Sequence, residues 1–279
     1  MSEVPQPVRL HPPAADSTQD SRHRTAPGRH HPEPYPSTTR RSHILTSALA
    51  ARTEAVFFDL DGTLADTAAD LVAPVQAMRS ERGLAPLPFD RLRCRASMGA
   101  RGLLGTGLGV DETMPGFPAL RDEFLQRYEA AMHVHTRLFP GMAEVLDTLE
   151  AASIRWGVVS NKIERFVRPI LDALGLLERA ACVIGGDTTA FAKPHPEPLL
   201  HGARVTGSAA TACIYVGDDE RDIRAGRAAG MTTIAVAWGF HPDDSPPEQW
   251  GADALIGEPH ELLALLRTPI AAGGRSRPG

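Results

Sequence analysis

Two carboxylates, Asp59 and Asp61, follow a short apolar run at residues 56–58. The run is too short for a helix and is typical of a buried strand. Side chains two residues apart at the end of a strand point the same way, so these carboxylates repel each other unless a cation lies between them or one is protonated. Gly62 permits a sharp turn there, and Thr63 can hydrogen-bond it. The pattern predicts a site for Mg²⁺ and phosphate.

Three other structures compete for the same residues. An acidic surface turn is the commonest place for an Asp-Gly pair. A calcium EF-hand loop has glycine at its sixth position, where this chain has Leu64, and is preceded by a helix rather than a strand. A hairpin needs a second alternating strand, whereas residues 65–79 predict a helix. The residues further along the chain decide between these structures.

Strand-like runs alternate with helical stretches after residue 150. The strands are expected at residues 155–159, 182–184, 213–216 and 232–236, and the helices at 163–174, 196–205, 219–229 and 259–266. Helices of this length between strands indicate parallel βαβ units. Helical stretches at 68–82, 89–98 and 117–132 form an insertion after the first strand. The predicted fold is therefore α/β, a doubly wound, mainly parallel Rossmann-like sheet with an inserted α-helical cap.

The predicted strands end on polar residues. The second ends at Ser160, Asn161 and Lys162, Lys193 follows the third, and the fourth ends at Asp218 with Asp222 four residues later. In a doubly wound sheet, ligands bind beyond the carboxyl ends of the strands. All these groups are therefore expected at one rim, together with the carboxylates that end the first strand.

Each group has a role in phosphoryl chemistry. Asp59 can attack phosphorus and form an aspartyl-phosphate, and Asp61 can protonate the leaving alcohol and then accept a proton from water. Ser160 and the neighbouring backbone N–H groups, that of Asn161 among them, can bind phosphoryl oxygens. Lys193 can neutralise the phosphate and keep Asp59 ionised.

The remaining carboxylates suit a metal ion. Asp59, Asp218 and the carbonyl of Asp61 provide oxygen ligands that Mg²⁺ prefers, and Asp222 can hold a metal-bound water. Structural roles are also open: Asp222 can be a surface acid, Ser160 a helix N-cap and Lys162 a solvated side chain. Asp219 and Glu220 are expected as an N-cap and a helix-dipole partner.

Composition limits the function further. The 29 basic residues are 27 arginines and two lysines, Lys162 and Lys193, which singles out both lysines in a chain that otherwise uses arginine. A net charge of −5 gives no basic surface for nucleic acid, and no apolar run approaches the length of a membrane span. Three widely spaced cysteines without a CxxC pair favour a reducing, cytoplasmic setting and argue against zinc.

Four domain assignments follow. Residues 1–50, rich in proline and histidine, predict a disordered extension, and 268–279 a loose tail. Residues 51–67 and 151–267 are expected to form the catalytic core, and 68–150 the helical cap.

The motifs DLDGTLAD, SNK, KPHPEPLL and GDDERDIRAG, in this order, resemble the haloacid dehalogenase superfamily of Mg²⁺-dependent phosphatases. The resemblance implies Asp59 as nucleophile and Asp61 as acid/base, Ser160 and Lys193 on phosphate, and Asp59, Asp61 and Asp218 on Mg²⁺.

Further runs, among them GARGLL and YEAAMHVHTRLFPGM, are similar to bacterial phosphoglycolate phosphatases and to related enzymes that dephosphorylate N-acetylmuramic acid 6-phosphate. One departure is Ile163, where many relatives have proline. The resemblance implies a phosphomonoesterase for a small phosphorylated metabolite, 2-phosphoglycolate first and N-acetylmuramic acid 6-phosphate as the alternative.

Other activities are open on the motifs. A sugar phosphomutase uses the same aspartyl-phosphate chemistry, and a non-catalytic binding module would have no use for both Asp59 and Asp61. A phosphonatase would need a lysine in the cap, which has none. Within the cap, Arg101 is expected on a flexible loop at the mouth of the site, where it could grip a carboxylate or hydroxyl of the substrate. A monomer or a homodimer is expected.

Overall fold

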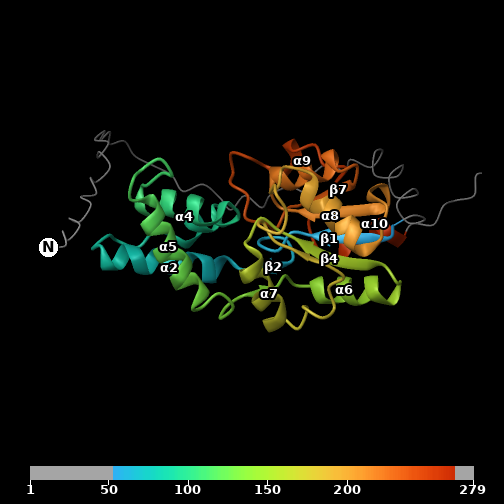
Figure 1. The fold of residues 1–279 in the computed structure, drawn as a ribbon, viewed down its shortest axis with the longest axis horizontal. Helices are drawn as coiled ribbons and strands as arrows, with labels where there is room; N and C mark the ends of the chain where they lie inside the picture. Colours follow the sequence, from blue (N-terminus) through green and yellow to red (C-terminus); the bar gives the residue numbers. More distant parts are fainter. Residues whose placement is uncertain (1–52, 268–279) are drawn as a thin grey trace, which may run out of the picture. The chain divides into compact units, whose positions relative to one another are not determined.

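The computed structural model describes residues 53–267. Six parallel strands form one sheet in the order β5-β4-β1-β6-β7-β8 (Figure 1). Their bounds are β1 Ala55–Phe58, β4 Arg155–Val159, β5 Val183–Ile184, β6 Cys213–Gly217, β7 Thr232–Val236 and β8 Ala254–Ile256. The predicted α/β fold with a parallel sheet is confirmed. Only β8 was not predicted, because three residues at a sheet edge carry little periodicity.

Strand β1 occupies the middle of the sheet because it is buried on both faces. It pairs in parallel with β4 on one side and β6 on the other, so that Phe58 lies opposite both Val158 and Val216. Val56 and Phe58 pack into one apolar cluster, and Ala55 and Phe57 into another. The continuous apolar run that ends at Phe58 is the signature of such a strand. The chain therefore leaves the sheet at its centre, where the strand order reverses.

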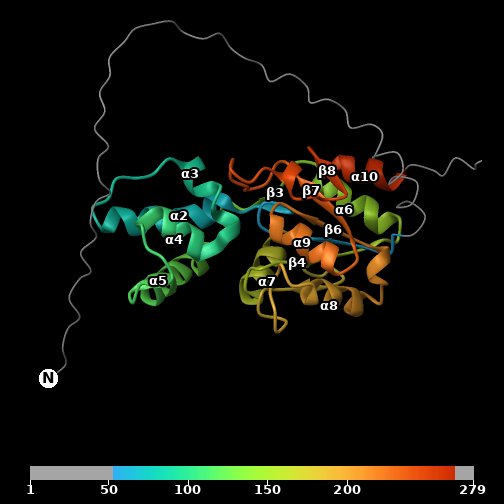
Figure 2. The ribbon, with the colours of Figure 1, turned by 90° about the horizontal axis from the view of Figure 1, so that it is seen from above.

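Helices cover both faces of the sheet. On one side α6 (Met142–Ala151) packs on β4 and on α10 (His260–Arg267), and on the other α8 (Glu197–Thr206) packs on β1, β4 and β5 (Figure 2). Helix α9 (Glu220–Ala228) packs on β6 and β7, and α7 (Glu164–Ala173) on β5. Helices that link parallel strands in this way are typical of βαβ units.

A helical cap lies between β1 and β4 in the sequence. It contains α2 (Ala68–Glu81), α3 (Phe89–Arg93), α4 (Gly99–Leu108) and α5 (Phe117–Glu129). The predicted helix at 89–98 is interrupted, because α3 ends at Arg93 and a separate 3₁₀ turn follows. The prediction of a helix from residue 65 was wrong by three residues, because Ala65–Asp66 (β2) pairs with Arg137–Leu138 (β3).

Helix α4 was predicted as a flexible loop. Glycine disfavours helix on propensity alone, and the segment contains several glycines. In the fold, a Cβ on Gly107 would lie 2.1 Å from Cγ1 of Val75 in α2. Glycine at this position lets the two helices approach closely, so tertiary packing outweighs the local preference.

The boundary of the cap needs one change. Helix α6, placed in the cap on sequence, packs on β4 and α10 and is part of the layer that covers the sheet. We propose that the cap comprises α2–α5 and returns to the core at β3. At this return, buried Asp70 accepts hydrogen bonds from the backbone of His135 and from both the backbone and the hydroxyl of Thr136.

The predictions for residues 1–50 and 268–279 lie outside the described residues. Within the described range, no helix combines the length and the apolar character needed to cross a membrane.

Candidate active site

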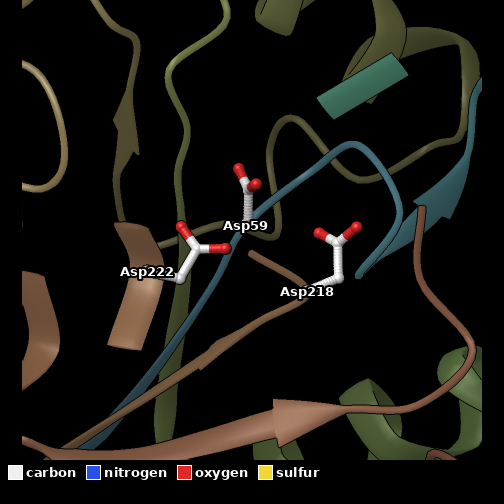
Figure 3. Close-up of side chains that lie close together, drawn as sticks. All are labelled: Asp59, Asp218 and Asp222. Carbon is white, nitrogen blue, oxygen red and sulfur yellow. The ribbon is translucent and has the colours of Figure 1, made fainter. Parts of the chain in front are cut away.

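Three carboxylates gather where the central strands end. Asp59 follows β1, Asp218 follows β6, and Asp222 lies in the first turn of α9 (Figure 3). All three are buried, and each offers an oxygen within 4.8 Å of the others. Strands β1 and β6 are neighbours in the sheet, which brings together residues more than 150 positions apart. A divalent cation fits this set of hard oxygen donors.

The electrostatics of the cluster also fit a cation. Burial, together with the charges of Asp59 and Asp222, raises the pKa of Asp218 well above its ordinary value. Burial likewise raises the pKa of Asp222 to about 7, against the opposing effect of a nearby lysine. Two glycines leave room for Asp218: a Cβ on Gly62 would lie 2.2 Å from Oδ2, and one on Gly239 would lie 2.2 Å from Cβ. Positive charge placed among these groups would stabilise their ionised forms.

Lys193 supplies a buried positive charge beside the cluster. Its Nζ lies 3.1 Å from Oδ1 of Asp59 and 2.7 Å from Oδ1 of Asp222, and it donates to the hydroxyl of Tyr215. Burial by itself would lower the pKa of Lys193, but the carboxylates of Asp222 and Asp59 outweigh it and raise that pKa. The lysine is therefore held charged within reach of the carboxylate predicted as nucleophile.

The loop that carries Lys193 is fixed by Asn161. The Asn161 side chain accepts from the backbone N–H of Lys193 at 2.9 Å and donates to its carbonyl at 3.0 Å. The side-chain amide of Asn161 therefore positions this loop. Phosphate binding through the backbone N–H of Asn161 stays a prediction. The hydroxyl of buried Ser160 accepts from the backbone N–H of Lys162 at 3.3 Å, and Ser160 is not the N-cap of α7, a position that Ile163 occupies.

Asp61 lies apart from the three clustered carboxylates. Its side chain accepts from the hydroxyl of Thr67 at 2.6 Å and from Lys162 Nζ at 2.8 Å. Lys162 is thus a buried ion-pair partner rather than a solvated side chain, with 7% of its side chain exposed. The ring of Tyr128, from the cap, lies beneath the Lys162 ammonium at 4.7 Å. Metal ligation by the carbonyl of Asp61 stays a prediction.

The helix that follows β6 is capped as expected. The Asp219 side chain accepts from the backbone N–H of Arg221, and Asp222 accepts from the backbone N–H of Asp219. Asp219 is therefore the N-cap. Asp222 combines its place in this capping box with the ion pair to Lys193, so it is not a surface acid.

A cavity of about 370 Å³ adjoins these groups. Arg101, predicted at its mouth, is not among the lining residues: more than half of its side chain is exposed, and it lies 3.8 Å from Glu112. The prediction that Arg101 lies on a flexible loop at the mouth of the cavity was wrong, because α4 is a helix and the Arg101 side chain lies beside Glu112. The lining arginine of the cap is Arg121 on α5, which sequence analysis did not single out.

Some of the contacts that were not predicted have a signal in the sequence, and others have none. The unusual lysine count indicated Lys162 but not its partner, Asp61. Helical spacing of Arg121, Phe124 and Tyr128 could have indicated one face of α5. Ser97 of the cap donates to Asp218 at 3.1 Å, a contact that no local pattern signals.

This geometry agrees with a known family. The family model of the haloacid dehalogenase-like hydrolases matches residues 56–236, a range that includes the aspartate cluster and both lysines. The chain belongs to this family. Membership accounts for the buried aspartate cluster at the carboxyl end of β1.

Several relatives of this haloacid dehalogenase-like hydrolase are closely similar over nearly their full length. An N-acetylmuramic acid 6-phosphate phosphatase of Pseudomonas putida is 46% identical over 78% of the chain and 98% of the relative. A phosphoglycolate phosphatase of Xanthomonas campestris is 48% identical over 75% of the chain and 94% of the relative. The crystal structure of a predicted phosphoglycolate phosphatase from Haemophilus somnus has a TM-score of 0.69 at 25% identity, covering 76% of this chain and 97% of the other. The chain is a phosphatase of this family.

The buried carboxyls of this hydrolase predict a pH-dependent stability without metal. Because the pKa values of Asp218 and Asp222 are raised, the folded protein binds more protons than the unfolded chain between about pH 5 and pH 7, and the free energy of unfolding should fall as pH rises through this range. Urea unfolding in EDTA at about pH 5.5 and about pH 7.5 measures the decrease. A divalent cation at about 100 times its Kd should add about 2.7 kcal/mol at the higher pH. Greater stability at pH 7.5 than at pH 5.5 in EDTA would contradict the prediction.

Proposed function

We propose that this protein is a Mg²⁺-dependent phosphomonoesterase that hydrolyses N-acetylmuramic acid 6-phosphate through an aspartyl-phosphate on Asp59. The observation that carries the proposal is the position of Asp59, which ends the central strand in contact with Lys193 and beside two further buried carboxylates. A carboxylate next to a buried ammonium is suited to attack a phosphate ester, whose own negative charge the ammonium offsets.

The reaction has two steps on this chain's residues. The Asp59 carboxylate attacks phosphorus and the ester P–O bond breaks, while protonated Asp61 gives its proton to the leaving alcohol oxygen. Asp61 then takes a proton from water as that water attacks the phosphoryl group, which frees Asp59 and inorganic phosphate. Thr67 and Lys162 orient the Asp61 carboxylate between the two steps. Ser160 and Lys193 bind the phosphoryl oxygens.

Mg²⁺ is the metal proposed for this site because the groups that would hold it are all oxygen donors. Asp59 and Asp218 would hold the ion, with Asp222 on a bound water and the carbonyl of Asp61 as a further ligand. Bound Mg²⁺ supplies positive charge that offsets the repulsion between the phosphate and the carboxylates.

The cavity favours the amino sugar over 2-phosphoglycolate, which reverses the order expected from sequence. Its volume of about 370 Å³ lies in the range of roughly 300–1,000 Å³ that is usual for drug-sized ligands, and a two-carbon acid would leave most of it unfilled. Apolar side chains, among them Leu71, Phe124, Leu125 and Phe166, line it together with the catalytic groups. Such a surface suits the C–H face of a sugar ring and an acetamido methyl group. The relatives include enzymes named for either substrate, at similar identity.

Phosphate release from a panel of substrates tests the proposal. The panel contains N-acetylmuramic acid 6-phosphate, 2-phosphoglycolate, glucose 6-phosphate, β-glucose 1-phosphate and p-nitrophenyl phosphate, each with Mg²⁺ and with EDTA. Mg²⁺-dependent release with the highest kcat/KM on the amino sugar is expected. A higher kcat/KM on 2-phosphoglycolate would identify that compound as the substrate instead. Isomerisation of β-glucose 1-phosphate without phosphate release would identify the protein as a mutase.

A further inference from the structure

One face of α5 forms a wall of the cavity. Arg121, Phe124, Leu125 and Tyr128 all line it, and their spacing of three, four and seven residues places them on one side of a helix. Phe124 and Tyr128 stack with ring centroids 6.2 Å apart, and Phe166 from α7 meets Tyr128 edge-on at 5.6 Å. The wall is therefore aromatic over most of its length and cationic at its N-terminal end.

The two ends of this wall differ in their distance from the reacting groups. At the Tyr128 end, the ring lies 4.7 Å from Lys162 Nζ, which in turn lies 2.8 Å from Asp61. Arg121 precedes Tyr128 by seven positions, which corresponds to roughly 10 Å along a helix axis. The Arg121 end is thus the end of the wall farther from the phosphate site.

The other cations that line the cavity already have close partners. Lys193 is paired with Asp59 and Asp222, and Lys162 with Asp61. Arg221 makes a two-pronged ion pair with Asp219 and donates to the carbonyl of Ser97.

Arg121 differs from these cations. Its nearest acid among the described residues is the adjacent Asp122, at 3.6 Å, and more than half of each side chain is exposed. An exposed ion pair of this kind contributes little to the free energy of folding. The Arg121 guanidinium can therefore leave Asp122 for a ligand at a small cost in free energy.

We propose that Arg121 binds a carboxylate carried by the alcohol part of the substrate, at the end of the cavity away from the phosphate. The inference rests on the proposed function, and it deepens it by naming what selects the substrate. In 2-phosphoglycolate the carboxylate carbon is only about 4 Å from phosphorus, three bonds away. In N-acetylmuramic acid 6-phosphate, the 3-O-lactyl carboxylate is eight bonds from phosphorus, roughly 9 Å when extended, so it can reach a part of the cavity well away from the phosphate. Arginine offers a planar fork that suits a carboxylate.

A matched pair of substrates isolates this contact. N-acetylglucosamine 6-phosphate is the same sugar phosphate without the lactyl group, so the ratio of the two kcat/KM values reports recognition of the lactyl group. The full-length protein with Mg²⁺ would be compared with Arg121→Gln, Arg121→Lys and Arg101→Gln. The last is the matched control, because Arg101 is an exposed arginine of the same cap outside the cavity.

Arg121→Gln should lower kcat/KM on N-acetylmuramic acid 6-phosphate by roughly 10- to 100-fold, the range of a charge-assisted hydrogen bond, chiefly through KM. Its kcat/KM on N-acetylglucosamine 6-phosphate and on p-nitrophenyl phosphate should change by less than about twofold. On N-acetylmuramic acid 6-phosphate, the kcat/KM of Arg121→Lys should lie between those of the wild type and Arg121→Gln. Arg101→Gln should match the wild type on all three substrates.

Three outcomes would overturn the inference. In the first, Arg121→Gln loses kcat/KM equally on both sugar phosphates, and in the second it loses none on either. In the third, the wild-type protein turns over p-nitrophenyl phosphate but not N-acetylmuramic acid 6-phosphate. In the first two outcomes the proposed function stands, and in the third the phosphatase reaction stands while its proposed substrate fails. Failure of the phosphatase reaction itself is recognised separately, as wild-type protein that releases no phosphate from any ester. In that case, calorimetric titration with N-acetylmuramic acid and N-acetylglucosamine decides the inference. The wild type is then expected to bind N-acetylmuramic acid more tightly than N-acetylglucosamine, and Arg121→Gln to abolish this difference. Equal binding of both sugars by the wild type overturns the inference.

Discussion

Asp59→Asn is expected to lower phosphate release by at least about 10⁴-fold, because Asp59 is the proposed nucleophile and its loss would remove the covalent route altogether. The carboxamide has nearly the same shape as the carboxylate but cannot displace the alcohol from phosphorus. It also removes one of the three clustered charges, so the metal-free variant should be at least as stable as the wild type at neutral pH. Phosphate release under saturating Mg²⁺, with unfolding measured in parallel, separates a chemical defect from a structural one.

The control for this variant is Asp172→Asn. Asp172 is an exposed aspartate of α7, away from the strand ends, and its replacement should leave kcat and stability unchanged. If Asp59→Asn retained activity within about tenfold of the wild type, the aspartyl-phosphate mechanism would have to be abandoned. Activity that reappears slowly during storage should be checked by mass spectrometry, since deamidation would restore the aspartate.

Replacement of Lys193 by methionine is expected to affect both stability and activity. It would leave the carboxylates of Asp59 and Asp222 buried without their cation, which costs about 3–5 kcal/mol when one partner of a buried pair is removed. In the proposed mechanism the charge of Lys193 stabilises the transferring phosphoryl group, so its loss should also reduce kcat by roughly 10²–10³-fold. Urea unfolding in EDTA and phosphate release with Mg²⁺ measure the two effects.

A double variant shows whether the cost arises from unpaired charge. Lys193→Met combined with Asp222→Asn should regain a substantial part of the lost stability, because both members of the 2.7 Å pair are then neutral. The double variant should stay inactive. Strictly additive destabilisation would mean that Lys193 stabilises the fold through packing of its methylene chain and not through its charge. Arginine should not replace it, because a planar fork does not reproduce the geometry in which a single Nζ contacts two carboxylates and the Tyr215 hydroxyl.

The sequence by itself was sufficient to predict five of the six strands of the sheet and the polar residues at its rim. Apolar runs such as residues 56–58 and 155–159 show strands directly, because a strand buried on both faces must be apolar throughout. The rule that parallel strands present their carboxyl ends to one edge then placed Asp59, Lys193 and Asp218 together without knowledge of the strand order. These predictions needed only local patterns and one general property of the fold class.

Tertiary structure decided which of the polar residues contact each other. Nothing local indicates that Lys162 pairs with Asp61 while Lys193 pairs with Asp59 and Asp222, because these partners are brought together by strand order and loop paths. The role of Asn161 likewise became visible only when the loop of Lys193 was seen to run beside it.

The cap was least predictable from sequence. Helix α4 forms against the propensity of its glycines, because Gly107 allows close packing on α2, and this helix carries Arg101 away from the cavity. Arg121 reaches the cavity because α5 turns the face shared with Phe124 and Tyr128 toward it. Local sequence thus determined the polar groups at the rim of the sheet, which follow strand ends in a fixed way. Packing between distant segments determined the cavity and the side chains that select what enters it, because their positions depend on contacts that no short stretch of sequence contains.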